Sequence, residues 1–569
     1  MKKSILSLGV AAALGGLGLA GTAGAVAVWD NEAHTVNEAP YNWGITIGSA
    51  STDTYPQADK LVQHPAGTGH ILVVPYYSAQ GQNQTLINIV NTDTVNAKAV
   101  KVRFRGATNS DDVLDFTVLM SPGDVWSGGV VQDATGMMKI IKSGDETTCT
   151  IPDVSGWDDE GGGTTSAASS STRLPGYLSG DQQAAMTREG YVEIMNMADI
   201  PQTSTTTKTS LYEAIKHVSG KAPCTAAPIA FLMTTDTVDV EDMAKYGLSW
   251  PTGGLMGSWA VMNQTQTVAF SGTSTAMIAT AGTLDASGTA PTAAAGVAFF
   301  PQTETVYGIN DYTRLPAGAT TIPAHNFEFL TADPLLTTSW GTPLPGTGSS
   351  WVQPLWFDVP DLSTPIIPGA KNDALPELQA KALSDTIAKN NVMNEWIATK
   401  DGGFATDWVI SQPTRRYMAA VWYDSSSGTS KALYNTQVVA NPYDGMLTLK
   451  PTTTYGPMLC ANYAFGAADR EEDMTSGGAQ FSPRTSTSTC GEVMTIQFGQ
   501  NSVLDAAITA SSVKSTLDKQ VAGDAGWGVL STPGGRYFPM IGWSGTKFMN
   551  GLTGAYYSFT EQHRWTSSY

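Results

Sequence analysis

Charged residues, histidine and cysteine are scarce in this 569-residue sequence, and each shortage excludes a class of protein. Only 14% of residues are charged, and 50 acidic residues outnumber 31 basic ones, giving a formal charge of −19 and a pI near 4.6. Phosphate backbones are bound by basic surfaces, so nucleic acid is excluded as the main partner. The histidines show no HxH or HExxH spacing, and there is no G-x-S-x-G motif. We therefore assign no catalytic residue and do not expect an enzyme.

Long apolar runs are missing after the first 25 residues. Two lysines precede an apolar stretch that ends at Ala20, and the small residues Ala23-Gly24-Ala25 follow it. We expect residues 1–25 to be a signal peptide, with a cut after Ala27 as the alternative. The mature chain then has 544 residues, a formal charge of −21 and no membrane-spanning segment. The leader predicts an exported protein at the cell surface or outside the cell, with the periplasm as the alternative.

Cysteine occurs only four times, at Cys149, Cys224, Cys460 and Cys490. An even number in an exported chain predicts disulfides, and the spacing favours the pairs Cys149–Cys224 and Cys460–Cys490. Zinc is the alternative, but it requires closely spaced CxxC pairs, and the sequence has none.

Short alternating segments separated by Asn, Gly and Asp clusters are abundant. Examples are "QTLINIVNT" (84–92) and "VLDFTVLM" (113–120), which are typical of antiparallel strands. We expect a mainly β protein with two or more antiparallel, Ig-like β-sandwich domains. The acidic, Gly-rich and Ser-rich stretch 158–172 is predicted to be a flexible surface loop.

The composition of the mature chain changes along the sequence and predicts three regions. We expect an N-terminal β-sandwich domain over 26–245, an irregular β region rich in Trp, Pro, Gly and Thr over 246–365, and a C-terminal β-rich domain over 366–569. One notable helix is predicted near 373–390, because Asp373 and Pro376 resemble a helix start.

The segment "KAVKVRFR" (98–105) raises the question of a binding site, because three cations alternate with apolar residues. If a hairpin sets Phe104 opposite Leu114, then Arg103 lies opposite Asp115 on the other face. An opposite-charge pair across two strands contributes only about 0.2–1 kcal/mol. We therefore interpret Lys101, Arg103 and Arg105 as the solvent face of a strand.

Clustered acids provide the one candidate metal site. Four acidic residues fall within seven positions, and carboxylate oxygens are ligands that Ca²⁺ prefers. The cluster matches no known calcium-loop spacing, and a solvated turn is the alternative interpretation. Calcium is the only cofactor for which the sequence offers ligands: Asp236, Asp239, Glu241 and Asp242.

Several segments together resemble a family of exported proteins. They are "TLINIVNT" (85–92), the stretch 101–126, "REGYVEI" (188–194), "TDWVISQPTRR" (406–416) and "KFMNG…HRW" (547–565). In these segments the chain is similar to large cell-surface or surface-layer-like proteins of Gram-negative bacteria. The resemblance implies a β architecture and a surface location. It brings no active-site residue to this sequence.

Three functions follow as hypotheses. The first is a secreted, surface-layer-like structural protein that associates with itself or with other cell-envelope components. The second is a secreted glycan-binding adhesin that uses exposed Trp and Tyr side chains. The third is a polysaccharide hydrolase with a pair of acids that the sequence does not reveal, because such acids meet only across a folded cleft.

Overall fold

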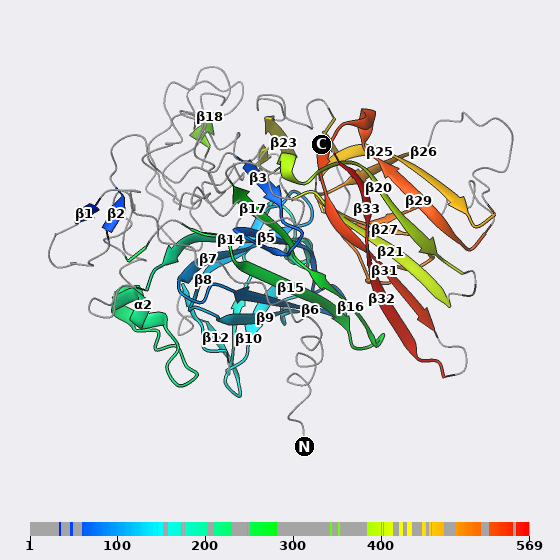
Figure 1. Cartoon of the computed structure of the whole chain (residues 1–569). Helices are drawn as coiled ribbons and strands as arrows, with labels where there is room; N and C mark the ends of the chain where they lie inside the picture. The colour runs from blue at the N-terminus through cyan, green and yellow to red at the C-terminus, as the bar shows by residue number, and fades with distance from the viewer. Residues whose placement is uncertain are drawn as a thin grey trace.

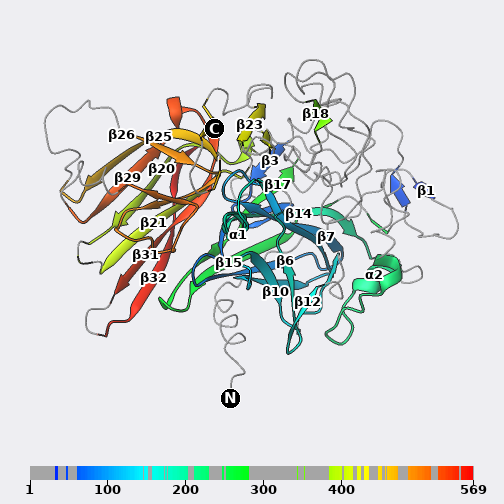
Figure 2. The same cartoon turned by 180° about the vertical axis from the view of Figure 1, so that it is seen from behind.

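The computed structural model describes residues 60–280 and 384–567, each range with internal gaps. It also describes two short strand pairs, β1 (Ala33–Thr35) with β2 (Thr46–Gly48) and β18 (Thr342–Pro343) with β19 (Trp351–Val352). The predicted signal peptide, 1–25, lies outside the described residues. Figures 1 and 2 show two groups of sheets side by side, blue to green for the N-terminal part and yellow to red for the C-terminal part.

The N-terminal sandwich pairs an eight-stranded sheet with a seven-stranded one. The eight-stranded sheet has the order β12-β13-β10-β9-β6-β15-β16, with β4 also on β15. Its strands are β4 (Thr68–Gly69), β6 (Asn83–Asn91), β9 (Val125–Gln132), β10 (Met138–Lys142), β12 (Asp158–Gly161), β13 (Thr164–Ala168), β15 (Leu255–Asn263) and β16 (Val268–Thr273). Buried positions alternate along β6 and β10, as expected for strands with one face on a core.

The seven-stranded sheet has the order β11-β8-β7-β14-β5-β17-β3. Its strands are β3 (Lys60–Gln63), β5 (Ile71–Ser78), β7 (Ala97–Gly106), β8 (Asp112–Met120), β11 (Cys149–Ile151), β14 (Glu189–Ile200) and β17 (Thr275–Thr280). All residues of β5, β7 and β14 are buried, so both faces of this sheet's centre are covered.

The C-terminal sandwich pairs a seven-stranded and a five-stranded sheet. The first has the order β24-β25-β29-β20-β30, with β26 on β25 and β33 on β20. Its strands are β20 (Ala388–Ile397), β24 (Thr448–Lys450), β25 (Met458–Asp469), β26 (Thr485–Cys490), β29 (Ala525–Ser531), β30 (Phe538–Pro539) and β33 (Arg564–Ser567).

The five-stranded sheet has the order β28-β27-β21-β31-β32. Its strands are β21 (Phe404–Ser411), β27 (Val493–Gln497), β28 (Ala510–Ser512), β31 (Ile541–Met549) and β32 (Tyr556–Gln562). The pair β27–β28 is parallel, and the other pairs of this sheet are antiparallel. A separate hairpin joins β22 (Ala420–Asp424) and β23 (Thr429–Tyr434). The prediction of a mainly β, sandwich-like protein is confirmed.

Helices are few among the described residues, and the predicted one differs from the structure. α1 (Gly180–Thr187) begins at a Ser179 capping box, and α2 (Ser210–Ile215) is a short helix. Of the helix predicted over 373–390, residues 373–383 lie outside the described residues, 384–386 are helical, and β20 begins at Ala388. The prediction is wrong from there on, because pairing with β29, β30 and β33 outweighs local helix propensity.

Two further expectations change. The predicted surface loop 158–172 contains the hairpin β12–β13. The sheets also do not follow the predicted boundary between 245 and 246, because β15 and β17 pair with strands that precede it. In particular, β15 pairs with β6 along its whole length, from Leu255 to Asn263.

Both predicted disulfides are confirmed. Cys149 bonds Cys224, and Cys460 bonds Cys490, which is also its direct partner in the register of β25 and β26. Two disulfides indicate an oxidising, extracytoplasmic compartment. Within the described residues, no helix has the length and apolar character needed to cross a membrane.

The two sandwiches share one core. A single cluster of buried apolar side chains runs through both, and the rings of Trp259 and Trp543 meet across the joint with centroids 4.8 Å apart. The buried carboxylate of Glu189 accepts hydrogen bonds from the backbone N–H groups of Ala507 (3.0 Å) and Ile508 (2.7 Å). The joint is thus packed and hydrogen-bonded, which makes the described sandwiches one body.

Candidate functional site

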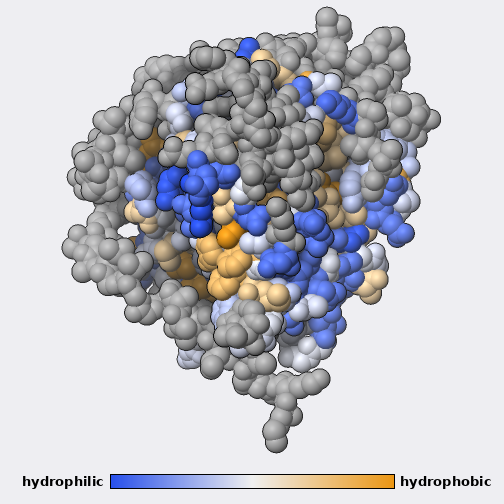
Figure 3. Space-filling view, turned by 90° about the vertical axis from the view of Figure 1, so that its right-hand side faces the viewer, coloured by the Kyte–Doolittle hydropathy of each residue, from blue (hydrophilic) through white to orange (hydrophobic). Residues whose placement is uncertain are grey.

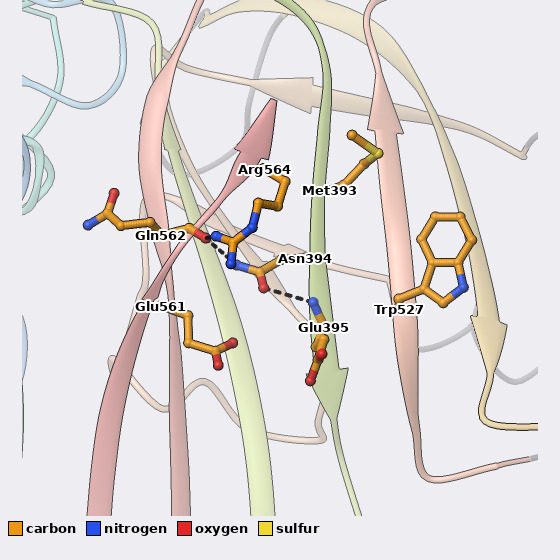
Figure 4. A pocket seen from close by; sticks show the side chains of 7 residues that line it. All are labelled: Met393, Asn394, Glu395, Trp527, Glu561, Gln562 and Arg564. Atoms are coloured by element: carbon orange, nitrogen blue, oxygen red, sulfur yellow. Dashed lines mark hydrogen bonds between the residues drawn. The ribbon is translucent and has the colours of Figure 1, made fainter. Parts of the chain in front are cut away.

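A surface groove of about 490 Å³ crosses the outer side of the C-terminal sandwich (Figure 4). This volume lies in the range of about 300–1,000 Å³ that is usual for small-molecule sites. Strands β20, β29 and β33 and the end of β32 supply its lining: Met393, Asn394, Glu395, Trp527, Glu561, Gln562 and Arg564.

Strand alternation puts an aromatic ring beside a carboxylate in this groove. Glu395 and Trp527 are direct register partners on β20 and β29, so their side chains lie on the same face. The next residue, Trp396, is buried in the core, which leaves Glu395 and Trp527 on the outer face. Trp527 is 45% exposed.

The floor of the groove is held by hydrogen bonds. Asn394 Nδ2 lies 3.1 Å from Nδ1 of the buried His563, and the other ring nitrogen, Nε2, lies 3.0 Å from the carbonyl of Val409. Burial lowers the pKa of His563 to about 3, so the ring is neutral at ordinary pH. Nε2–H then donates to Val409, and Nδ1 accepts from Asn394. The Asn394 amide oxygen in turn accepts from the Glu395 N–H at 2.8 Å.

Two carboxylates and one guanidinium complete the lining. Glu395 and Glu561 are exposed, and among the described residues neither carboxylate forms an ion pair or a hydrogen bond. Arg564 Nη1 donates to the Gln562 carbonyl at 2.9 Å. The groove therefore offers free acceptors, one cation and a flat ring to a ligand.

The basic row of β7 lies elsewhere and is not a solvent face. The predicted register is confirmed: Phe104 pairs with Leu114 and Arg103 with Asp115. However, Lys101, Arg103 and Arg105 are fully buried, so the interpretation as a wet face is wrong. The face of β7 that the sequence predicts to be exposed to solvent is covered in the fold.

Acidic partners for this row come from neighbouring strands. Glu193 of β14 is the register partner of Arg103, and its Oε2 lies 3.4 Å from Arg103 Nη1 and 3.3 Å from Arg105 Nε. Arg103 Nε also lies 3.3 Å from Asp112 Oδ2. The two guanidinium groups are enclosed and paired, which explains how their burial is tolerated.

A second buried ion pair lies at the start of the same strand. Lys98 Nζ is 2.8 Å from Asp199 Oδ1 and 2.9 Å from the Thr252 hydroxyl. Asp199 also accepts from the Thr252 N–H at 3.2 Å. This pair connects β7 and β14 to the segment before β15, and its closed geometry indicates a structural role.

Asp407 is a buried carboxylate near the joint of the sandwiches. Its Oδ2 accepts from the Ser502 hydroxyl (2.5 Å) and from the backbone N–H groups of Val503 (2.9 Å) and Leu504 (3.3 Å). Burial nevertheless raises the pKa of Asp407 to about 7, while the charge of Lys547 acts weakly in the opposite direction. The Asp407 carboxyl group is therefore protonated over much of the pH range below its pKa of about 7.

The remaining predicted site residues are the four cysteines and the four acidic calcium candidates. All four cysteines are in disulfides. The calcium candidates Asp236, Asp239, Glu241 and Asp242 lie outside the described residues, so that site stays a prediction. Within the part of the chain that is described, no three His, Cys, Asp or Glu side chains form a group able to hold a metal ion.

Sequence reasoning missed the groove. Its residues come from three segments, 393–395, 527 and 561–564, that are far apart in the chain. One local signal existed: in "NEWI" (394–397), alternation puts Glu395 on the face opposite the apolar Trp396. Nothing local indicated that Trp527 lies next to it.

Comparison of the chain with protein-family models, with curated proteins and with solved structures found no match.

Proposed function

We propose that this chain is an exported, surface-layer-like structural protein that associates with further copies of itself through β32. Three features support the proposal: an oxidising compartment, two sandwiches that share one core and an aromatic edge strand. The last of these is the observation that carries it.

β32 is an exposed edge strand rich in aromatic residues. It ends the order of the five-stranded sheet, and among the described strands its backbone pairs only with β31. The hydroxyls of Ser558 and Thr560 hydrogen-bond the backbone of β16, so one face of β32 packs on the N-terminal sandwich and the face of Tyr557 and Phe559 stays exposed. Tyr557 is 48% exposed and Phe559 43% exposed. Figure 3, viewed from the side of the C-terminal sandwich, shows apolar residues at the surface beside strongly hydrophilic ones. An open edge with apolar side chains is a template for another strand.

The strand is complementary to itself. In an antiparallel pair of two copies with the two-fold axis at Phe559, all residues from Tyr556 to Gln562 find a partner. Phe559 then lies opposite its own copy, and Glu561 lies opposite Tyr557 of the second copy. No two like charges face each other, which matters for a chain of formal charge −19.

A contrasting edge strengthens the choice of β32. At the far end of the N-terminal sandwich, β12 is fully exposed and carries Asp158, Asp159 and Glu160. Like charges along an edge oppose pairing with a second copy. Of these two edges, only β32 suits association of this acidic chain with itself.

A charge swap at residue 559 tests the proposal. Phe559→Lys and Phe559→Glu each place like charges opposite one another, so both variants should sediment as monomers where the mature wild-type protein associates. An equimolar mixture should associate again, because Lys then faces Glu. Analytical ultracentrifugation measures both effects, and Tyr537→Lys, at another exposed aromatic residue, is the matched control.

The proposal fails if the wild-type protein stays monomeric at all concentrations, or if both single variants associate as the wild type does. Electron micrographs with and without calcium then show whether association extends to a lattice. The glycan-binding alternative is favoured by the groove and is developed next. The hydrolase alternative stays a prediction, for which Glu395 and Glu561 are the carboxylates that the groove brings together.

A further inference from the structure

We propose that the groove over β20 binds a neutral sugar ring, with Trp527 as the stacking platform. This glycan site goes beyond the structural function and does not depend on it, because its stacking residue, Trp527, lies on β29 and not on β32, although both proposals use Glu561. The argument rests on the exposed ring, the arrangement of acceptors and donors, the charge and the rigid floor.

Trp527 is exposed without a packing reason. The residue is 45% exposed, although a large apolar side chain on a sheet usually packs against a neighbour. The flat face of an indole fits the C–H face of a pyranose ring, and the N–H remains available for a hydrogen bond. In Figure 4 the ring stands at one side of the groove, across β20 from Glu561 and Arg564.

The polar lining matches hydroxyl groups. Each sugar hydroxyl donates one hydrogen bond and accepts others, whereas an ionised carboxylate only accepts and a guanidinium only donates. Glu395 and Glu561 provide acceptors on two sides of the groove, and Arg564 provides donors. Hydrogen bonds to such charged groups are stronger than those between neutral groups.

Charge decides which ligand class fits. The exposed carboxylates of Glu395 and Glu561 repel phosphates and uronic acids, which disfavours nucleotides and acidic polysaccharides. The guanidinium of Arg564 opposes a metal ion in the same groove. A neutral, polyhydroxylated ring satisfies both groups, so the geometry favours neutral glycans over acidic ones.

The floor is already ordered before a ligand arrives. The buried indole of Trp408 donates from Nε1 to the Glu395 carbonyl at 3.0 Å, and Asn394 is held by His563. Backbone bonds within β20 and β29 fix Glu395 beside Trp527. Such preorganisation reduces the entropy that a ligand must overcome on binding.

The test titrates the mature protein with cellohexaose, mannohexaose and chitohexaose as neutral probes and hexagalacturonate as the acidic probe. Isothermal titration and saturation-transfer difference NMR report binding. We expect at least one neutral probe to bind more tightly than hexagalacturonate. Trp527→Ala should weaken that binding by about tenfold or more, Glu395→Gln by a smaller factor, and Trp527→Phe should retain most of it, since a flat ring remains.

Tyr537→Ala is the matched control, because Tyr537 is 37% exposed and does not line the groove. The inference is overturned if no neutral probe binds at millimolar concentration, if hexagalacturonate binds best, or if Trp527→Ala binds as the wild type does. Phe559→Lys separates the two proposals: it should leave sugar binding unchanged while abolishing association, and Trp527→Ala should do the reverse.

Discussion

Among the described residues, the buried lysines and arginines lie in the N-terminal sandwich and the exposed aromatic rings lie in the C-terminal sandwich. In the N-terminal sandwich, Lys98, Arg103 and Arg105 of β7 are fully buried. In the C-terminal sandwich, Trp527 and Phe559 are exposed. Buried charges must be matched by fixed partners, so they specify the internal arrangement of strands. Exposed rings contribute little to the isolated chain and are available to partners. The proposals above therefore place the contacts with partners on the C-terminal sandwich, where the exposed rings lie.

The largest expected effect is on the buried charges. Arg103→Ala removes one partner of the ion pair with Glu193, and we expect a loss of about 3–5 kcal/mol in the free energy of unfolding. Lys139→Ala is the matched control, because its pair with Glu160 (2.6 Å) lies at the surface and should contribute little to stability. Urea unfolding of both variants measures the difference. Equal losses would contradict the assignment of β7 as an enclosed ionic strand.

A smaller, pH-dependent effect is expected at the joint between the sandwiches. The pKa of Asp407 is raised to about 7 in the folded state, above its value of about 4 in the unfolded state. The native state therefore holds a proton that the unfolded state has released between these values, and stability falls as pH rises through this window. Asp407→Asn removes the titration.

The measurement is urea unfolding of the wild type and of Asp407→Asn at several pH values. Relative to the wild type, the variant should gain about 1–2 kcal/mol in the free energy of unfolding from about pH 5.5 to about pH 7. Using the difference between the two proteins cancels the titration of other groups, including the opposing one of His563. A difference that does not change with pH would show that Asp407 is ionised throughout.

The smallest effect on stability is expected at the exposed rings. Phe559→Ser should change the free energy of unfolding of the monomer by less than about 0.5 kcal/mol, because the ring is 43% exposed at a sheet edge. The same substitution should reduce self-association. Unfolding is measured at concentrations below those at which the wild type associates. A loss above about 2 kcal/mol would mean that the ring stabilises its own sandwich and would weaken the comparison.

Local patterns predicted what depends on neighbours in the chain. The register of β7 and β8 followed from alternation, which fixes the residues that share a face. The two disulfide pairs were predicted from the even number of cysteines and from their spacing in the sequence. Alternation does not reveal what covers a face, and Glu193 reaches Arg103 from 90 positions away. Alternation therefore predicts that the basic row faces solvent, although the fold encloses it.

The same limit explains the remaining differences. Residues 388–390 were assigned to a helix from local propensity, but their partners include Phe538 and Ser567, far along the chain. The segment 158–172 has a composition typical of loops, yet Gly161, Gly162 and Gly163 have positive φ and form the turn of a hairpin. The groove needs three distant segments, so no local pattern could define it.

The bonds to Glu189 also impose an order on how the molecule forms. Its carboxylate accepts from the backbone of Ile508, which follows 319 residues later. The N-terminal sandwich thus has a carboxylate, that of Glu189, and an apolar surface whose partners are synthesised only after most of the polypeptide. Contacts of such long range form slowly. If the chain is translocated from its N-terminus, as proposed, the joint is completed only after residue 508 has crossed the membrane.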